Sequence, residues 1–224
     1  MEKILVIGSH PDDETLGAGG AIARHRFAGD EVSVLVLTEG VTARHREVEK
    51  QQQAALAACS ALGVTDVHFS GLPDQRLDAM PLLEVIQPIS KLISTLMPDV
   101  IYTHHGGDLN QDHRIVFNAT MIAVRPLGER RIKRVLCYEV PSSTEWAPPY
   151  SDRAFMPNVF INIEKQLEKK LEALQAYSST HISEVPSYPH PRSIEAVKNL
   201  ARQRGIQSGM SAAEAFCLAR EIVR

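Results

Sequence analysis

Short, almost wholly apolar runs alternate with longer amphipathic segments along most of this chain, and the alternation constrains the fold more than any other feature. The run 32–37, Val-Ser-Val-Leu-Val-Leu, is apolar at nearly every position, as expected for a strand buried on both faces. Strands of this kind form parallel sheets, in which each crossover connection usually contains a helix. The pattern therefore predicts an α/β fold, with helices on both faces of a mostly parallel sheet.

The order of these segments predicts a Rossmann-like, doubly wound topology. The proline-rich stretch 141–158 is predicted to be a structured loop that packs over the sheet. A length of 224 residues suits one α/β domain, and no linker or repeat divides the sequence, so we expect a single domain over 1–224. We predict strands at 3–7, 32–37, 67–69, 100–103 and 135–138, and helices at 17–28, 44–62, 82–96, 112–124, 166–177, 194–204 and 212–222.

Composition excludes several classes of partner. A formal net charge of −3 gives no reason to expect nucleic acid or an anionic membrane surface. No apolar stretch approaches the ~20 residues of a membrane span, and the N-terminal apolar run is too short for a signal peptide, so we expect a cytoplasmic protein. The cysteines Cys59, Cys137 and Cys217 are far apart in the sequence, without a CxxC pair, and are predicted to be buried thiols.

A group of ionisable side chains follows the first predicted strand directly. It comprises His10, Asp12, Asp13 and Glu14, in the segment His-Pro-Asp-Asp-Glu. Several acidic groups crowded at the end of a buried strand repel each other and lose hydration, unless a cation or a substrate compensates. The natural compensating group is a divalent metal ion, and we interpret the cluster as part of a metal site.

A second polar cluster follows the strand predicted at 100–103, and the carboxyl ends of parallel strands meet at one edge of a sheet. Imidazole and carboxylate ligands suit Zn²⁺, although Fe²⁺, Mn²⁺ or Ni²⁺ could also bind. A catalytic zinc uses about three protein ligands and an open position for water. We select His10, Asp13 and His113 as the metal ligands, and Asp12 as the general base that takes a proton from the metal-bound water. The second cluster contains His104, His105, Asp108, Asn110, Asp112 and His113.

Other interpretations of these residues remain open. Either Asp12 or Asp13 could simply cap the helix that follows, since aspartate is favoured at that position. Of the neighbours His104 and His105, one could support the site while the other lies in the core or at the surface. The sequence lacks a GxSxG nucleophile elbow, an HExxH helix and a GxGxxG dinucleotide motif, which argues against those three classes.

His10-Pro11-Asp12-Asp13-Glu14 together with Asp112-His113-Arg114 resembles the motifs of the LmbE-like, or PIG-L, metal-dependent N-deacetylases. The resemblance covers most of the chain and implies that the first-motif His and second Asp, with the second-motif His, bind the metal, while the first Asp is the general base. These roles fall on His10, Asp13, His113 and Asp12.

The family often carries a catalytic histidine three residues before the second-motif ligand, where this chain has Asn110. Because an amide cannot supply a proton, His105 or His190 would have to protonate the leaving amine, or Asp12 would return the proton it has taken. The resemblance also implies an arginine after the second strand that contacts substrate, which could be Arg44 or Arg46. Further candidates for substrate binding or for support of the ligands are Glu14, Asp108 and Asp112.

The expected function is hydrolysis of an N-acetyl group on an amino sugar or glycoconjugate, a small-molecule substrate. An amidase that cleaves a thiol-sugar conjugate is the first alternative, with the same site and a larger leaving group. A non-catalytic sugar- or nucleotide-binding module is the second. The native metal, the acetylated sugar and a possible homo-oligomeric state are left open by the sequence.

Overall fold

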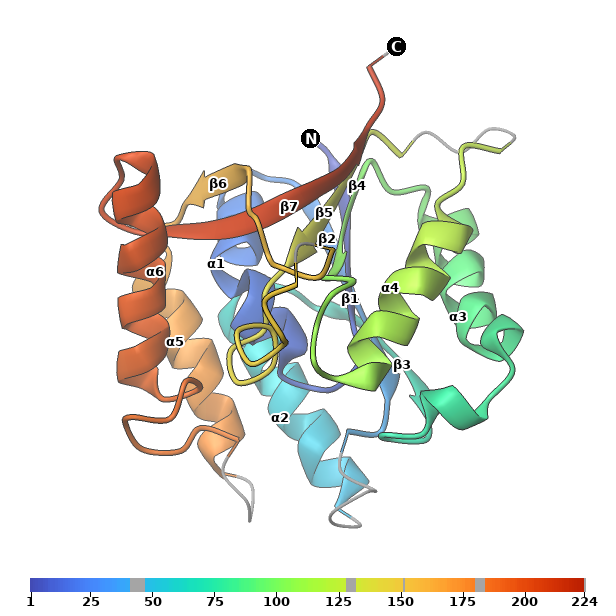
Figure 1. The fold of residues 1–224 in the computed structure, drawn as a ribbon, viewed down its shortest axis with the longest axis horizontal. Helices are drawn as coiled ribbons and strands as arrows, with labels where there is room; N and C mark the ends of the chain where they lie inside the picture. The colour runs from blue at the N-terminus through green and yellow to red at the C-terminus, as the bar shows by residue number, and fades with distance from the viewer. Residues whose placement is uncertain (41–46, 128–131, 151, 180–183, 224) are drawn as a thin grey trace.

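Seven strands form one sheet in the order β3-β2-β1-β4-β5-β7-β6 (Figure 1). The computed structural model describes residues 1–40, 47–127, 132–150, 152–179 and 184–223. The first five strands are parallel to one another, and β7 is antiparallel to both β5 and β6. The predicted α/β class and the mostly parallel sheet are therefore confirmed. The strands are β1 (Lys3–Gly8), β2 (Glu31–Thr38), β3 (Asp66–Leu72), β4 (Val100–His104), β5 (Arg134–Tyr138), β6 (Val159–Asn162) and β7 (Ala213–Glu221).

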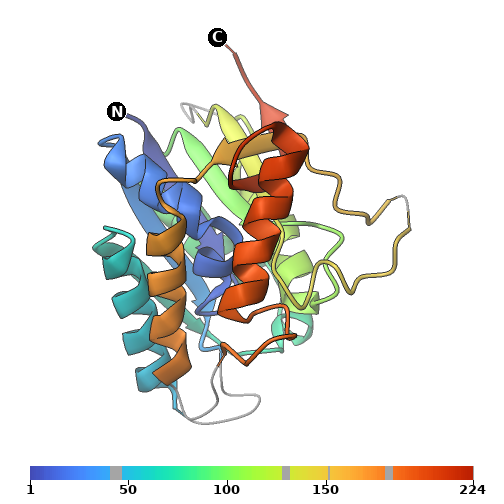
Figure 2. The same ribbon diagram turned by 90° about the vertical axis from the view of Figure 1, so that its left-hand side faces the viewer.

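Helices cover both faces of the sheet (Figures 1 and 2). One face carries α1 (Asp13–Phe27), α2 (Val48–Ala61), α5 (Leu167–Gln175) and α6 (Ile194–Ser208). The other face carries α3 (Leu82–Leu96) and α4 (Gln111–Ala123), which pack against each other. Two short 3₁₀ turns complete the elements, η1 (Leu77–Ala79) and η2 (Ala176–Ser179). Within the described ranges, no helix is both long and apolar enough to cross a membrane.

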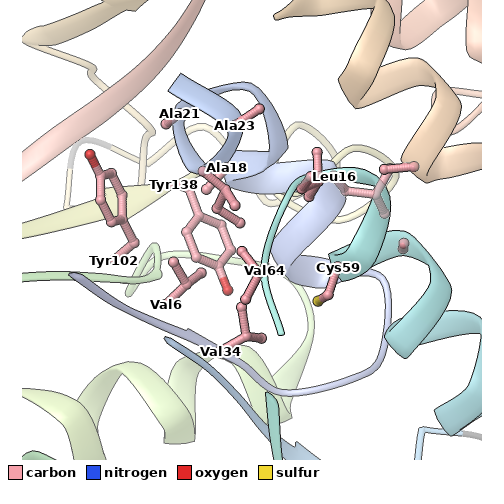
Figure 3. Close-up of a cluster of buried hydrophobic side chains, with 14 of the residues drawn as sticks. Val6, Leu16, Ala18, Ala21, Ala23, Val34, Cys59, Val64, Tyr102 and Tyr138 are labelled. Carbon is pink, nitrogen blue, oxygen red and sulfur yellow. The ribbon is translucent and has the colours of Figure 1, made fainter. Parts of the chain in front are cut away.

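Alternate residues of the central strands supply two separate hydrophobic cores. On β1, Val6 belongs to the core under α1, while Leu5 and Ile7 belong to the core under α3 and α4. Figure 3 shows the first of these cores, with the ring of Tyr138 between the sheet and α1. A Cβ atom at Gly17 of α1 would lie 2.2 Å from Cδ2 of Tyr138, so only glycine allows this close packing of helix on strand.

The helix predicted at 212–222 is wrong, because Ala213–Glu221 forms strand β7. Alanine, glutamate and arginine give this segment a high intrinsic helix propensity. However, β7 pairs on one side with β5 and on the other with β6, a strand that the sequence did not indicate. Ladder hydrogen bonds on both sides override a propensity of a few tenths of a kcal/mol per residue.

The carboxyl ends of β1 and β4 form the edge at which a ligand site is expected. From β1 the chain crosses to β2 on one side, and from β4 it crosses to β5 on the other. The adjacent strands β1 and β4 therefore lie at the topological switch point, where the two connections diverge and leave a crevice. Both polar clusters of the sequence begin at this crevice.

Candidate functional site

The crevice is lined by the turn that links β1 to α1 and by the loop that links β4 to α4. Ser9 follows the first strand, and its backbone N–H donates to Nε2 of His104, the last residue of β4, at 2.9 Å. This bond ties the two strand ends together. Asn110 caps α4, because its Oδ1 accepts the N–H of Asp112 at 2.9 Å, and the capped first turn carries His113 into the crevice.

His10, Asp13 and His113 offer ligand atoms that all lie within 4.8 Å of one another, and all three residues are buried. Nδ1 of His10 lies 3.3 Å from Nε2 of His113 and 3.3 Å from Oδ2 of Asp13. Oδ1 of Asp13 lies 3.4 Å from Nε2 of His113. The two ring nitrogens and the carboxylate therefore face a common point.

The second nitrogen of each of these histidines faces another carboxylate. Nε2 of His10 lies 3.2 Å from Oδ2 of Asp112, and Nδ1 of His113 lies 3.1 Å from Oδ1 of Asp108. When a histidine gives one N–H to a carboxylate, its other nitrogen keeps a lone pair for a metal. A second possible ligand group, His10 with Asp74 and Asp112, would need the His10 nitrogen that faces those carboxylates. The set His10, Asp13 and His113 fits a cation better.

The electrostatics of the crevice favour positive charge at these imidazoles. Burial acts to lower the pKa of His10, but hydrogen bonds with Asp112 and Asp13 raise it to about 10. Burial also acts to lower the pKa of His113. The negative charge of Asp13 and the hydrogen bond with Asp108 outweigh this effect and raise the pKa of His113 to about 9. Oδ1 of Asp13 is buried and has no hydrogen-bond partner among the described residues. Surplus carboxylate charge and an unpartnered carboxylate oxygen are the conditions under which a divalent cation fits.

Asp12 occupies the N-cap position of α1 but makes no side-chain capping bond, and its side chain is part of the pocket wall. Its backbone is left-handed, with φ 116°, a conformation that costs a non-glycine residue about 1–3 kcal/mol. The backbone N–H of Asp12 donates to Oε2 of Glu14 at 3.1 Å. Glu14 is itself held by the hydroxyls of Thr15 and Tyr177, at 2.7 and 2.6 Å. Glu14 thus lies behind Asp12 and fixes its backbone.

Arg192 contacts the side chain of Asp12, whereas Glu14 contacts its backbone. Its Nη1 donates to Oδ2 of Asp12 at 2.7 Å and to Oε2 of Glu184 at 3.2 Å, while its Nε donates to Oγ of Ser142 at 2.7 Å. Burial raises the pKa of Asp12 to about 8, and the guanidinium of Arg192 acts against that rise. The pocket has a volume of about 290 Å³ and is lined by His10, Pro11, Asp12, Gly40, Gln75, Asn110, Glu184 and Arg192.

The remaining predicted residues divide into those at the crevice and those elsewhere. His105 lies away from it, since its Nε2 is 2.9 Å from the carbonyl oxygen of Arg153 and its ring packs edge-on against Phe155. His190 accepts the backbone N–H of Arg192 at 3.2 Å and does not line the pocket. Arg44 and Arg46 lie outside the described residues.

Several residues at the crevice were not singled out from the sequence. Of the two neighbouring histidines, His104 is the one beside the cluster, with its Nε2 3.3 Å from Oδ2 of Asp13 and its ring stacked on that of His113. The side chains of adjacent residues at the end of a strand point in opposite directions. The sequence alone could not show which of the two histidines faces the crevice, because that depends on the register of β4. Asp74, Glu184 and Arg192 come from loops, and their proximity depends on tertiary packing.

Comparisons with known proteins identify the family and the fold of the chain. Residues 5–124 match the PIG-L family, whose description is GlcNAc-PI de-N-acetylase. The chain belongs to this family. The uncharacterized deacetylase YaiS of Escherichia coli (strain K12) is 32% identical over 182 residues, which cover 79% of this chain and 90% of that protein. A 1D-myo-inositol 2-acetamido-2-deoxy-alpha-D-glucopyranoside deacetylase of Actinosynnema mirum is 30% identical over 229 residues, which cover 79% of this chain and 80% of that protein.

A solved structure extends the similarity to the whole fold. The crystal structure of the conserved protein TT1542 from Thermus thermophilus has a TM-score of 0.79 to this chain and 25% sequence identity. It covers 100% of this chain and 97% of its own. The family match ends at residue 124, before β5, so the region that contains Arg192 is related to a known protein through this fold comparison.

Proposed function

We propose that this protein is a metal-dependent N-deacetylase that hydrolyses the acetamide of an amino sugar or glycoconjugate, in the cytoplasm. The observation that carries the proposal is the set His10, Asp13 and His113, which faces one point next to the pocket-lining carboxylate of Asp12. The relatives support the same chemistry, since the Actinosynnema mirum protein is named for a 2-acetamido sugar.

We assign the metal to Nδ1 of His10, the carboxylate of Asp13 and Nε2 of His113. Two imidazoles and a carboxylate suit Zn²⁺, with Fe²⁺, Mn²⁺ and Ni²⁺ as alternatives. When bound, such an ion supplies a Lewis acid that polarises a carbonyl and lowers the pKa of water. Asp108 and Asp112 hold the histidine rings in the orientation that this requires.

Asp12 is the general base in this mechanism. Its side chain lies in the pocket wall, its neighbour Asp13 belongs to the ligand set, and its backbone is fixed by Glu14. The carboxylate therefore faces the reacting centre without being one of the three proposed ligands. Asp12 takes a proton from the attacking water, and a positioned base of this kind contributes typically 10²–10⁴-fold to the rate.

Arg192 is a positioning residue for Asp12. Its guanidinium donates to Oδ2 of Asp12 while Ser142 and Glu184 hold it from behind, so one carboxylate oxygen of Asp12 is engaged and the other remains available. The same contact stabilises the ionised carboxylate, which is the form that accepts a proton.

The leaving amine needs a proton, and Asn110 cannot supply one. His105 contacts Arg153 and Phe155, and His190 does not line the pocket, so neither is placed to act. We therefore propose that Asp12, once protonated, returns its proton to the nitrogen as the carbon–nitrogen bond breaks. The acetyl carbon leaves as acetate, with the oxygen of the attacking water, and the sugar amine is the second product.

The pocket limits how much of the substrate is enclosed. A volume of about 290 Å³ lies at the lower end of the roughly 300–1,000 Å³ of small-molecule sites, and it suits one sugar ring with its acetamide. Any aglycone or further sugar would then lie outside this pocket.

The test is a screen of N-acetyl sugars in free, glycosidic and nucleotide-linked form, with detection of the amine and of acetate after zinc loading. Asp12→Asn should retain metal and lose about 10²–10⁴-fold in kcat/KM. His113→Ala should lose metal, as measured by elemental analysis. Exposed Asp78→Asn is the matched control and should change neither quantity. An Asp12→Asn enzyme at full speed would overturn the base assignment, and a His113→Ala enzyme with full metal would overturn the ligand set.

Two alternatives predict different products. An amidase acting on a thiol-sugar conjugate releases an amino acid or larger acid instead of acetate, so product analysis separates it from the deacetylase. A non-catalytic sugar-binding module would bind an N-acetyl sugar, with or without metal, and release neither product. The three-ligand set beside a candidate base argues for a hydrolase over the module.

A further inference from the structure

Two cysteines that are far apart in the sequence are direct partners in the sheet. Cys137 of β5 and Cys217 of β7 lie opposite each other in the antiparallel pairing, flanked by the pairs Leu136–Leu218 and Tyr138–Phe216. Figure 1 shows β5 and β7 side by side. Both thiols are free in the structure. Nothing in the sequence indicates this pairing, because the segment that forms β7 has the composition of a helix.

The spacing of such a pair suits a disulfide. Residues directly opposite in an antiparallel pair have Cα atoms about 4.5–5.5 Å apart, and their side chains project from the same face of the sheet. Disulfides bridge Cα separations of about 4.4–6.8 Å. Both hydrogen-bonded and non-hydrogen-bonded pairs in an antiparallel sheet fall within this range. The Cα separation therefore allows the bridge without movement of the backbone.

The two thiols differ in access to solvent. Cys137 is buried, whereas Cys217 is half-buried. Burial raises the pKa of Cys137 to about 12, and the nearby Cys217 adds to the rise. The pKa of Cys217 is raised by burial and by Glu139, with Arg204 acting against. A small oxidant can thus reach Cys217 first, and reaction at neutral pH is expected to be slow.

We propose that Cys137 and Cys217 form a disulfide across β5 and β7 when the protein meets a low-molecular-weight disulfide such as oxidised glutathione. The thiolate of Cys217 attacks the glutathione disulfide, forms a mixed disulfide and releases one reduced glutathione. The thiolate of Cys137 then attacks the Cys217 sulfur and displaces the second reduced glutathione. In total, two protein thiols are oxidised to one disulfide, and one glutathione disulfide is reduced to two thiols.

The bridge would join the parallel sheet to the C-terminal part of the chain. Strand β7 follows α6, and the segment just before α6 carries Arg192 to the pocket. The residue after Cys137 is Tyr138, whose hydroxyl donates to the carbonyl oxygen of Ile7 at 2.7 Å, three residues before the proposed ligand His10. A covalent link at this point closes a long loop of the unfolded chain and stabilises the fold that places both sides of the pocket.

The experiment is incubation of the full-length protein with oxidised glutathione at mildly alkaline pH, followed by mass spectrometry of the intact and trypsin-digested protein. The expected result is loss of two hydrogens and a linked pair of peptides, one with Cys137 and one with Cys217. Cys137 and Cys217 fall on different tryptic peptides, because Arg153 and Arg204 lie between them. The oxidised protein should also melt roughly 10 °C higher, an increase that dithiothreitol reverses.

Three variants make the result decisive. Cys217→Ser, at a half-buried position, should fold and form no linked peptide or thermal shift, and Cys137→Ala should behave in the same way. Cys59→Ser is the matched control, since Cys59 lies buried on α2 in the core, and this variant should form the link fully. A glutathione adduct that stays on Cys217, a link that involves Cys59, or a link between two molecules would each overturn the proposal.

Discussion

Replacement of Asp108 by asparagine should weaken zinc binding without removing any proposed ligand. The Asp108 carboxylate lies 3.1 Å from Nδ1 of His113, and it accepts hydrogen bonds from the hydroxyls of Ser143 and Thr144 and, at 2.8 Å, from the backbone N–H of Asn110. The residue is 1% exposed, so no solvent replaces these contacts. An amide in this position turns one acceptor into a donor and removes the charge that orients the imidazole.

The magnitude follows from these contacts. Partners behind a metal-bound histidine typically contribute 10–100-fold to metal affinity, so the dissociation constant for zinc should rise by about that factor. The loss of one buried acceptor should lower the free energy of unfolding by about 1–3 kcal/mol. A competition titration against a chromophoric zinc chelator measures the first quantity, and urea unfolding of the metal-free protein measures the second.

Ser143→Ala is the control that separates the two effects. It breaks the loop contact to Asp108 and leaves the His113 contact in place, so it should lose about 1 kcal/mol of stability and keep the zinc affinity of the unaltered protein. The reasoning fails if Asp108→Asn binds zinc within twofold of the unaltered protein while it loses stability. Asp108 would then only anchor the 141–158 loop.

Three further predictions concern the stability of the fold. Gly17→Ala places a Cβ 2.2 Å from the ring of Tyr138 and should lower the unfolding free energy by about 1–3 kcal/mol in urea titrations, whereas no loss would mean that the helix shifts freely. Lys170→Met removes the cation that lies 2.6 Å from the buried Glu214 carboxylate and should cost about 3–5 kcal/mol in the same assay. Burial acts to raise the pKa of Asp30, but hydrogen bonds from a backbone amide and an imidazole lower it below its usual value. The stabilisation from Asp30 is therefore present above its unfolded pKa of about 3.9 and is lost as the pH falls through the folded value, so Asp30→Asn should destabilise at neutral pH and much less in strong acid.

The fold could be predicted from the sequence because local signals and tertiary packing agree over the parallel strands. Short, β-branched apolar runs such as 32–37 favour buried central strands, and the alternation with helices favours a parallel direction. The C-terminal part differs, because β7 has the composition of a helix and becomes a strand only through its partners on both sides.

Only the part of the candidate site that follows β1 and β4 could be predicted from the sequence. His10, Asp13 and His113 follow two strands whose carboxyl ends must meet at the same edge, so their proximity follows from the topology. Their role as metal ligands stays a prediction. Arg192 and Glu184 carry no such signal, because nothing local in the sequence indicates that the loop before α6 reaches Asp12.

The two walls of the pocket consequently come from different stretches of the chain. The side with His10, Asp12 and Asn110 belongs to the region that matches the family, and the side with Glu184 and Arg192 lies well beyond it. Sequence can therefore vary in the second stretch, by substitution, insertion or exchange of a whole loop, without moving the three proposed ligands. A protein built in this way could acquire a new sugar preference through changes in its C-terminal third, as long as the contact between Arg192 and Asp12 is kept.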